Sequence, residues 1–212
     1  MIASVVGDPL LAAFLTFTLV FVATPGATTA VIVRNALDGG RRAGLYAAVG
    51  AAAANLTHAT LARLGGAALL TAWPGGLNAI RVAGGGYLAF LGVRGLWTLY
   101  TQWSAPVVPA RTGSLGSPHH SLREGFAVNM LSPVILTFYL AVVPTFIRPV
   151  WPRSAYWLLA AAHVTTAFAC HSAWVLALHR MRTIFERHGP RRVLGLAASL
   201  AMLVLAGRVL LR

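Results

Sequence analysis

Three long stretches without a charged residue constrain what this chain can fold into. They run from Pro9 to Val33, from Gly125 to Ile147 and from Ser154 to His179, and each is 23 to 26 residues long. About 20 consecutive apolar residues form a helix that crosses the hydrocarbon core of a bilayer. We therefore expect each stretch to span a membrane. The composition agrees, because only 10% of the residues are charged, against about 25% in an ordinary soluble domain.

Three further apolar stretches, each interrupted by arginine, complete the expected set of helices. They are Ala43 to about Leu70, which contains Arg63, about Asn78 to Leu99, and Val193 to Leu211. The start of the chain, MIASVVGDP, lacks the basic residues of a secretory signal peptide, so the first helix is expected to remain in place. The sequence thus predicts an all-α integral membrane protein with six transmembrane helices.

The basic residues predict how these helices are oriented. All seventeen are arginines, and most lie in the first, third and fifth connections between the expected helices. Cytoplasmic connections of membrane proteins are enriched in arginine and lysine, so both termini are expected outside the cytoplasm. The arginines are spread over short connections and do not form one patch, which argues against a nucleic-acid partner despite a net charge of +13.

A polar segment divides the chain into two halves. Thr101 to Glu124 is rich in Pro, Ser and Gly, and we interpret it as a cytoplasmic linker, residues 101–124. It separates a first three-helix repeat, residues 1–100, from a second one, residues 125–212. Because a unit of three helices returns the chain to the other side of the membrane, the second unit enters from the opposite side. Any similarity between the halves therefore makes an inverted repeat.

The first helix of each half carries helix-breaking residues at corresponding places. The first contains TPG, Thr24 to Gly26, and the second contains LSP, Leu131 to Pro133. Proline lacks the backbone N–H and clashes with the preceding turn, so each helix is expected to break there. Backbone groups freed inside a membrane are tolerated only where protein or a wet cavity satisfies them. Paired breaks in two halves therefore indicate a transporter binding site.

At these residues the chain resembles the LysE/RhtB family of bacterial amino-acid exporters. The resemblance runs through RNALDGGRRAGL, GAAAANLTHATLARLGGAALL, RVAGGGYLAFLGVRGLW and REGFAVNMLSPVILTFYLAVVPTFI. The family's first-helix motif is usually Pro-Gly-Pro, and here Ala27 replaces the second proline. Its fourth-helix motif is usually Asn-Pro followed by a basic residue, and here Ser132 and Val134 replace the asparagine and the basic residue. Asn129 matches an upstream asparagine of that motif.

The resemblance implies the function and the location. It implies a secondary active exporter of an amino acid or similar small zwitterion in the bacterial inner membrane, driven by the proton gradient or the membrane potential. Its partners would be the substrate and membrane lipid. We expect alternating access around the two breaks, with half-helix N-termini at the substrate carboxylate. The candidate substrate-binding residues are Thr24, Pro25, Gly26, Thr28, Asn55, His58, Asn129, Ser132 and Pro133.

Several polar residues of the expected helices have two possible roles each. Asn55 and His58 share a helix face and serve either the substrate or a structural interhelical hydrogen bond. Arg63 binds a substrate carboxylate or extends to the membrane interface. His163 is either a functional ionisable group or a neutral structural histidine. A proton-coupled mechanism would use one of these titratable residues: His58, His163, His171, Asp8 or Glu124.

The four acidic residues, Asp8, Asp38, Glu124 and Glu186, all lie in or beside the expected connections. The absence of a buried counter-charge disfavours a cationic substrate and favours a neutral amino acid. The sequence has one cysteine and no HExxH motif, so no metal site, cofactor or enzymatic activity is expected. A non-transporting scaffold or accessory subunit is the alternative function. The small-residue helix faces would permit a homodimer.

Overall fold

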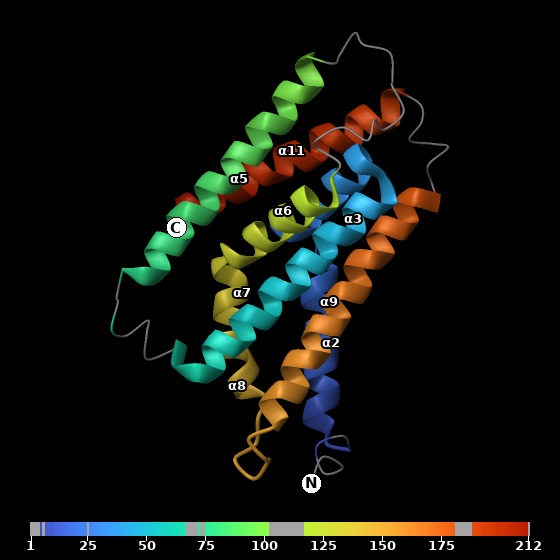
Figure 1. The fold of residues 1–212 in the computed structure, drawn as a ribbon. Helices are drawn as coiled ribbons and strands as arrows, with labels where there is room; N and C mark the ends of the chain where they lie inside the picture. Colours follow the sequence, from blue (N-terminus) through green and yellow to red (C-terminus); the bar gives the residue numbers. More distant parts are fainter. Residues whose placement is uncertain are drawn as a thin grey trace.

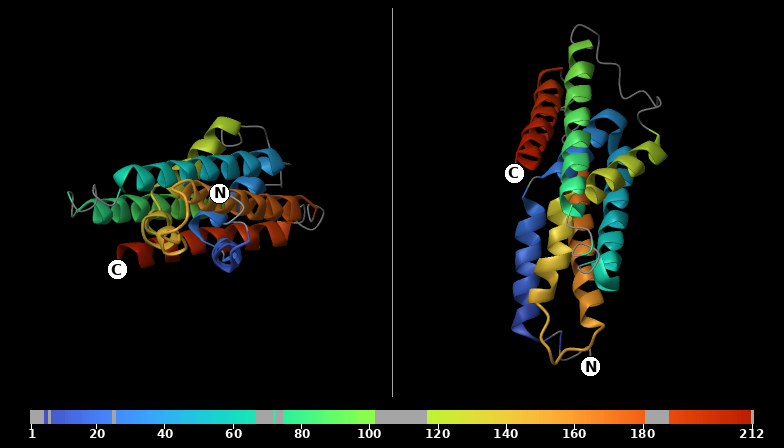
Figure 2. Two further views of the ribbon diagram at one scale, coloured as in Figure 1. Left: turned by 90° about the horizontal axis from the view of Figure 1, so that it is seen from below. Right: turned by 90° about the vertical axis from the view of Figure 1, so that its left-hand side faces the viewer.

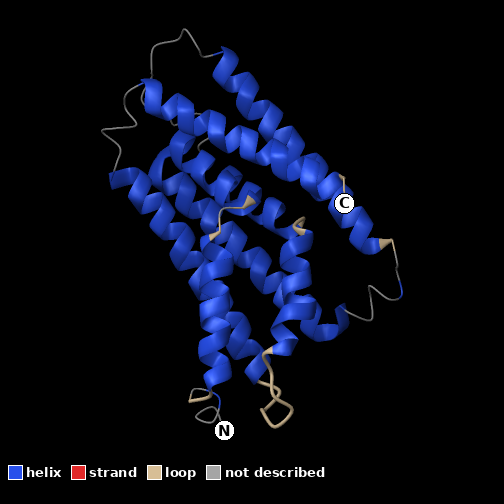
Figure 3. Ribbon diagram, turned by 180° about the vertical axis from the view of Figure 1, so that it is seen from behind, coloured by secondary structure: helices blue, strands red, loops and turns tan. Residues whose placement is uncertain are grey.

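The computed structural model describes residues 5, 7–24, 26–66, 72, 75–101, 117–180 and 188–211. The elements within these ranges are all helical, as Figure 3 shows. They form an elongated bundle in which the N-terminus lies at one end (Figure 1). The prediction of an all-α fold is therefore confirmed for the described part of the chain.

The first expected span is broken at the predicted place. Helix α2 (Pro9–Ala23) begins at Asp8, whose side chain accepts a hydrogen bond from the Leu10 N–H at 2.9 Å, with Pro9 at the first helical position. Both residues favour a helix start. Helix α3 (Ala27–Leu61) then begins after Gly26, and its axis is bent by more than 40° relative to α2. Pro25, between them, lies outside the described residues.

Helix α3 contains a sharp corner at Gly40, where φ is 75°. Only glycine adopts such a φ readily, because it has no Cβ atom. Beyond this corner the helix runs back toward the end of the bundle that holds the N-terminus (Figure 1). It ends in a π-helix, η1 (Ala62–Gly66). The two parts of α3 thus correspond to the end of the first expected span and to most of the second.

The second predicted break is also present. Helix α6 (Pro118–Met130) begins at Ser117, inside the range expected for the linker, and residues 102–116 of that range lie outside the described residues. After Leu131 and Ser132 the chain continues as α7 (Pro133–Thr137), a π-helix η3 (Phe138–Val142) and α8 (Val143–Thr145). The axis turns by 58° at the break.

The remaining helices follow the other expected spans. They are α5 (Gly76–Thr101), α9 (Ala155–Arg180) and α11 (His188–Leu210). By length and composition α9 can cross a membrane alone, and each bent pair qualifies as one broken span, which gives up to three spans among the described residues. The count of six spans and their inverted-repeat arrangement stay predictions.

Close backbone contacts hold the two halves together. Helix α3 packs mainly on α6 and α9, and α5 packs on α11 (Figure 2). Where α3 crosses α6, a Cβ atom on Gly50 would collide with the carbonyl oxygen of Leu122, and one on Gly125 would collide with that of Ala47. Small residues permit such backbone approach between membrane helices. This crossing fixes the end of α6 against α3, where the candidate site lies.

Candidate functional site

A cavity of about 290 Å³ lies between the two breaks. Its lining comes from α2, α3, α5, α6, α7, α9 and α11, so it is central in the bundle. Most lining side chains are apolar, with Phe21, Leu88 and Leu205 among them. The described residues that line it include no arginine, aspartate or glutamate. A charged ligand in this cavity would therefore meet polar groups and backbone dipoles without an ionised carboxylate or guanidinium beside it.

Most of the predicted binding residues meet at this cavity. Those that line it are Thr24, Gly26, Thr28, Asn55, Asn129, Ser132 and Pro133. Pro25 lies outside the described residues. His58 is buried behind the cavity, where its Nε2 lies 3.2 Å from the carbonyl oxygen of Asn129. His58 therefore makes a structural contact with α6 and does not line the cavity, whereas the other described candidates do.

The start of α3 presents free backbone donors to the cavity. Its first helical hydrogen bond runs from the Ala30 N–H to the Gly26 carbonyl at 2.9 Å, so the N–H groups of Ala27, Thr28 and Thr29 have no acceptor within the helix. Gly26 provides no side-chain cap. These residues all line the cavity. The end of a helix with free N–H groups carries partial positive charge and suits a carboxylate.

Ala27 adds a donor that the family motif lacks. A proline at this first helical position would fit the helix but has no N–H. With alanine, the chain offers one more backbone donor at the cavity. The departure from the Pro-Gly-Pro pattern therefore changes the chemistry of the site without disturbing the helix start.

Asn129, at the end of α6, connects the second break to α3, including its start, by hydrogen bonds. Its Nδ2 donates to the carbonyl oxygen of Ala51 at 2.8 Å and to Oδ1 of Asn55 at 2.7 Å. Its Oδ1 accepts from the Thr28 hydroxyl at 3.1 Å. Both amide hydrogens are used, so Asn129 positions its neighbours and has no hydrogen left for a ligand. It is 1% exposed.

At the second break a side chain caps the helix that follows. The Ser132 hydroxyl accepts from the Ile135 N–H at 3.4 Å and so caps α7, while Pro133 has no N–H to satisfy. The carbonyl of Leu131 packs so closely on α5 that a Cβ atom at Gly84 would collide with it. This break therefore also borders the cavity, but its own serine caps the helix that follows it.

The end of α2 supplies the opposite charge. Phe21 and Val22 in its last turn line the cavity, and the last carbonyls of a helix carry partial negative charge. The Thr24 hydroxyl donates to the Val20 carbonyl at 2.9 Å, which leaves its oxygen lone pairs able to accept. The negative end of α2 and the positive end of α3 thus meet at one cavity. This pairing of dipoles suits a zwitterion.

Two histidines of α9, His163 and His171, line the far side of the cavity. Nδ1 of His163 lies 2.7 Å from the hydroxyl of Tyr139 in η3. The sequence reasoning missed Tyr139, because only the irregular π-helix turns it toward α9. Arg63, by contrast, is exposed in η1 and does not line the cavity, so the structure does not support a carboxylate-binding role for it.

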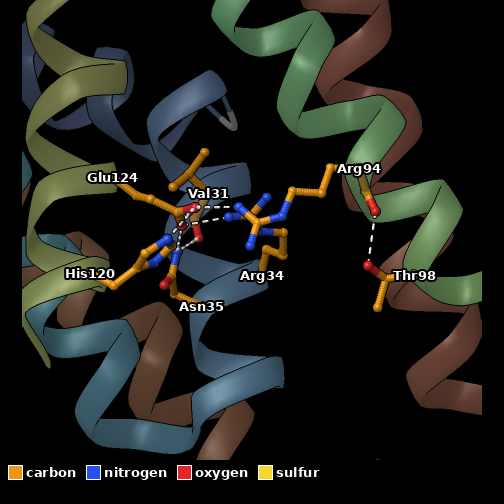
Figure 4. A network of polar contacts seen from close by, with 7 residues as sticks. All are labelled: Val31, Arg34, Asn35, Arg94, Thr98, His120 and Glu124. Carbon is orange, nitrogen blue, oxygen red and sulfur yellow. Dashed lines mark hydrogen bonds and ion pairs between the residues drawn. The ribbon is translucent and has the colours of Figure 1, made fainter. Parts of the chain in front are cut away.

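A buried carboxylate lies one turn before Asn129 on α6. Glu124 is 4% exposed and pairs with Arg34 of α3, and it also accepts from Nδ2 of Asn35 at 2.9 Å (Figure 4). Nη1 of Arg94 in α5 lies 3.7 Å away, and Nε2 of His120 lies 3.8 Å away. The sequence placed Glu124 beside a connection and gave no sign of a contact with Arg94. The structure instead joins both in a network that links α3, α5 and α6.

A second ion pair lies at the other end of the bundle. Oδ2 of Asp8, before α2, lies 2.8 Å from Nε of Arg148, which follows α8, and the Arg148 side chain is half exposed. The backbone hydrogen bond from Leu10, and with it the bond and charge of Arg148, hold the pKa of the Asp8 carboxyl below its ordinary value. This pair ties the outer ends of the two broken spans together.

Comparisons with known proteins identify the family. The chain is 29% identical over 157 residues to the uncharacterized membrane protein YahN of Escherichia coli, which covers 71% of this chain and 68% of the relative. It is 29% identical over 146 residues to an uncharacterized membrane protein of Vibrio cholerae, covering 66% and 68%. No solved structure matches it. The profile of the LysE type translocators matches residues 19–212, which confirms the resemblance seen in the sequence: the chain is a membrane protein of the LysE type translocator family.

Proposed function

We propose that this protein exports a neutral amino acid with a small side chain across the bacterial inner membrane. The substrate carboxylate binds the N–H groups at the start of α3, and the ammonium group binds the carbonyls at the end of α2 and the Thr24 hydroxyl. The observation that carries this proposal is the meeting of two opposite helix ends at one cavity. Such half-helix ends form substrate sites in other transporters with broken helices.

The lining supports the choice of substrate class. A cationic or anionic side chain would need a counter-charge, and the described lining residues provide none. The apolar wall of Phe21, Leu88 and Leu205 suits an aliphatic side chain. A volume of about 290 Å³ lies just below the range of drug-sized ligand sites, about 300–1,000 Å³, and so suits a small substrate.

The proposed mechanism is alternating access between two inverted three-helix repeats, which together make six spans. The two breaks, which both bend their spans by more than 40°, support such a pairing. The arginine-rich corner at Gly40 and the end of α9 lie opposite the N-terminus (Figure 1), which supports placing that end in the cytoplasm and both termini outside. The Glu124 network would then form the cytoplasmic contact between the halves, and the Asp8–Arg148 pair the outer one.

The proposed energy source is the proton gradient. The described residues offer two kinds of titratable group for coupling: the histidines beside the cavity and the Glu124 network. Substrate efflux measured with the pH gradient and the membrane potential clamped separately would identify the driving force. Efflux that follows the potential alone would contradict proton coupling and leave substrate export intact.

Transport by the full-length protein in proteoliposomes tests the function. Vesicles loaded with unlabelled valine, leucine, glutamate or arginine would be assayed for uptake of the labelled compound by exchange. We expect exchange of valine or leucine and none of glutamate or arginine. Isobutylamine, which lacks the carboxylate of valine, and isovalerate, which lacks its ammonium group, should not compete.

A matched control variant is Thr60→Val, because Thr60 is exposed on α3 and its hydroxyl bonds only within its own helix at 2.8 Å. Its exchange rate should equal that of the wild type. If no amino acid exchanges in vesicles that contain folded protein, the proposal is wrong and the scaffold alternative gains support. If isobutylamine competes as well as valine, the carboxylate site at α3 is wrong.

A further inference from the structure

His163 is a buried polar group that the structure leaves half satisfied. It lies in the middle of α9, is 0% exposed and lines the cavity. Its Nδ1 has the Tyr139 hydroxyl as partner at 2.7 Å. Its Nε2 is buried and has no hydrogen-bond partner among the described residues. Buried polar groups are rarely left unpaired, because desolvation without a hydrogen bond costs free energy.

The contact with Tyr139 determines which hydrogen the imidazole carries. The Tyr139 hydroxyl is also buried, and within the described part of the chain its hydrogen-bond partner is His163. A phenol that only accepted would leave its own hydrogen unpaired, whereas a phenol that donates to Nδ1 satisfies it. In the neutral ring the hydrogen then resides on Nε2. The free nitrogen is therefore a donor that lacks an acceptor.

No acceptor for Nε2–H of His163 lies within hydrogen-bond distance in the part of the chain that the structure describes. The ring of Phe138 packs on the imidazole with 4.2 Å between centroids, and the ring of Phe21 lies 6.2 Å away. The π-helix η3 holds both Phe138 and Tyr139 against α9. Irregular turns of this kind occur frequently at functional sites. The aromatic contacts hold the ring of a residue that lines the cavity, so the unpaired donor belongs to a fixed side chain beside the ligand space.

We propose that Nε2–H of His163 donates a hydrogen bond to an oxygen of the substrate, and that this bond helps to select it. This role rests on the proposed function. The acceptor is either the second oxygen of the carboxylate or an oxygen on the substrate side chain. Tyr139 is a positioning residue, because it acts by holding the hydrogen of His163 on Nε2.

Valine and threonine distinguish the two acceptors, because they have nearly the same shape and differ by one hydroxyl. The full-length protein in proteoliposomes would be assayed for exchange of each amino acid, with KM and the maximal rate measured separately. His163→Leu removes the donor. His163→Gln places an amide nitrogen near the position of Nε2, and His163→Asn places one near Nδ1. The exposed His179 of the same helix provides the control, His179→Leu.

We expect His163→Leu to raise KM about tenfold, the effect of one hydrogen bond of the stronger kind. His163→Gln should restore most of the affinity, His163→Asn should not, and Tyr139→Phe should fall between. If His163→Leu raises the KM for both valine and threonine, the acceptor is the substrate carboxylate. If it raises the KM for threonine alone, the acceptor is the hydroxyl of the substrate side chain. If His163→Leu does not fold, the contrast between His163→Gln and His163→Asn remains.

Two results would overturn this role. Unchanged KM values for both amino acids in His163→Leu would show that the donor is not used. Equal KM values in His163→Gln and His163→Asn would show that the residue only fills space. If the folded wild type exchanges neither amino acid, the proposed function fails and this role with it, whereas wild-type exchange with no effect at His163 overturns this role alone.

Discussion

The two breaks lie at corresponding places in the sequence but differ in how their backbone groups are satisfied. At the first break Gly26 offers no side-chain cap, and the residues that begin α3, whose N–H groups have no acceptor within the helix, line the cavity. At the second break Ser132 caps α7 and the Leu131 carbonyl packs against Gly84. Asn129, three residues before Ser132, is tied to α3 by three hydrogen bonds.

This difference assigns separate roles to the two breaks. Free N–H groups inside a membrane are tolerated only where a cavity or a ligand satisfies them. The first break meets that condition and provides the binding groups. The second break is capped by Ser132, and Asn129 beside it positions the start of α3 through hydrogen bonds.

The largest effect on stability is expected at Glu124. Glu124→Gln leaves Arg34, whose side chain is 12% exposed, without its main counter-charge. Removing one partner of a buried pair typically costs about 3–5 kcal/mol, so we expect a loss of about 3 kcal/mol in the free energy of unfolding. Denaturant titration in detergent micelles would measure it. A loss below about 1 kcal/mol would show that the network does not hold α6 to α3.

A smaller loss of about 2 kcal/mol is expected for Asn129→Leu. The leucine has a similar volume but cannot pair with the Ala51 carbonyl, Asn55 or Thr28, and buried groups left unpaired cost about 1–3 kcal/mol. Substrate KM should rise as well, because Thr28 at the start of α3 loses its support. Thermal unfolding and exchange assays would measure the two effects. An increase in KM without a loss of stability would instead indicate that Asn129 contacts the substrate.

Ser132→Ala should destabilise the protein by about 1 kcal/mol, the usual effect of losing a helix cap. The exchange rate should change little, because the Ser132 hydroxyl stabilises the start of α7 and the proposed substrate contacts lie at the first break. Ser132→Asn, which restores the asparagine of the family motif, should recover the stability, since asparagine is an equally good cap. Calorimetry on the three proteins would test this order. Failure of Ser132→Asn to recover stability would contradict the capping role.

The smallest effect is expected at Asp8, which caps the outer end of α2. Because its pKa is lowered in the folded state, it stabilises the fold above pH 3.8, its ordinary pKa, and this contribution is lost as the pH falls through the lowered value. Asp8→Asn keeps a capping side chain but should remove that part of the pH dependence. Unfolding curves from about pH 2 to 5, which extend below the ordinary pKa, would test it. Identical pH dependence in both proteins would contradict the assignment.

Much of the fold was predictable from local sequence. TPG and LSP mark the breaks because proline and serine act on the backbone within one turn, and the long apolar stretches place α5, α9 and α11. Thr24, Thr28, Asn55 and Asn129 could be assigned to one site because they lie at or opposite these breaks. The corner at Gly40 was also within a predicted connection.

The missed features depend on contacts between distant residues. Arg34 and Glu124 are 90 positions apart, so the burial of Glu124 has no local signal. Tyr139 reaches His163 through a π-helix, whose extra residue per turn leaves no regular pattern in an apolar stretch. His58 shares a face with Asn55, but Asn129 occupies the space in front of it. The sequence likewise did not predict that the helix after the second break has a side-chain cap and the helix after the first break has none.

The most direct test is a substitution that gives the start of α3 a side-chain cap of its own. Gly26 has an extended backbone, with φ −131° and ψ −169°, and a Cβ atom added there would meet nothing within 4 Å. Gly26→Asp therefore fits and would place its own carboxylate on the N–H groups of α3, adding about 1 kcal/mol of stability. Gly26→Ala adds the Cβ atom without the cap, and Thr60→Val is the matched control away from the cavity.

The measurement is the KM and rate of amino-acid exchange in proteoliposomes for the wild type and these three variants, with unfolding curves for each. We predict that Gly26→Asp is at least as stable as the wild type yet loses exchange by more than tenfold, while Gly26→Ala loses little and Thr60→Val nothing. Wild-type exchange in a stable Gly26→Asp protein would contradict the claim that the free start of α3 binds the substrate carboxylate.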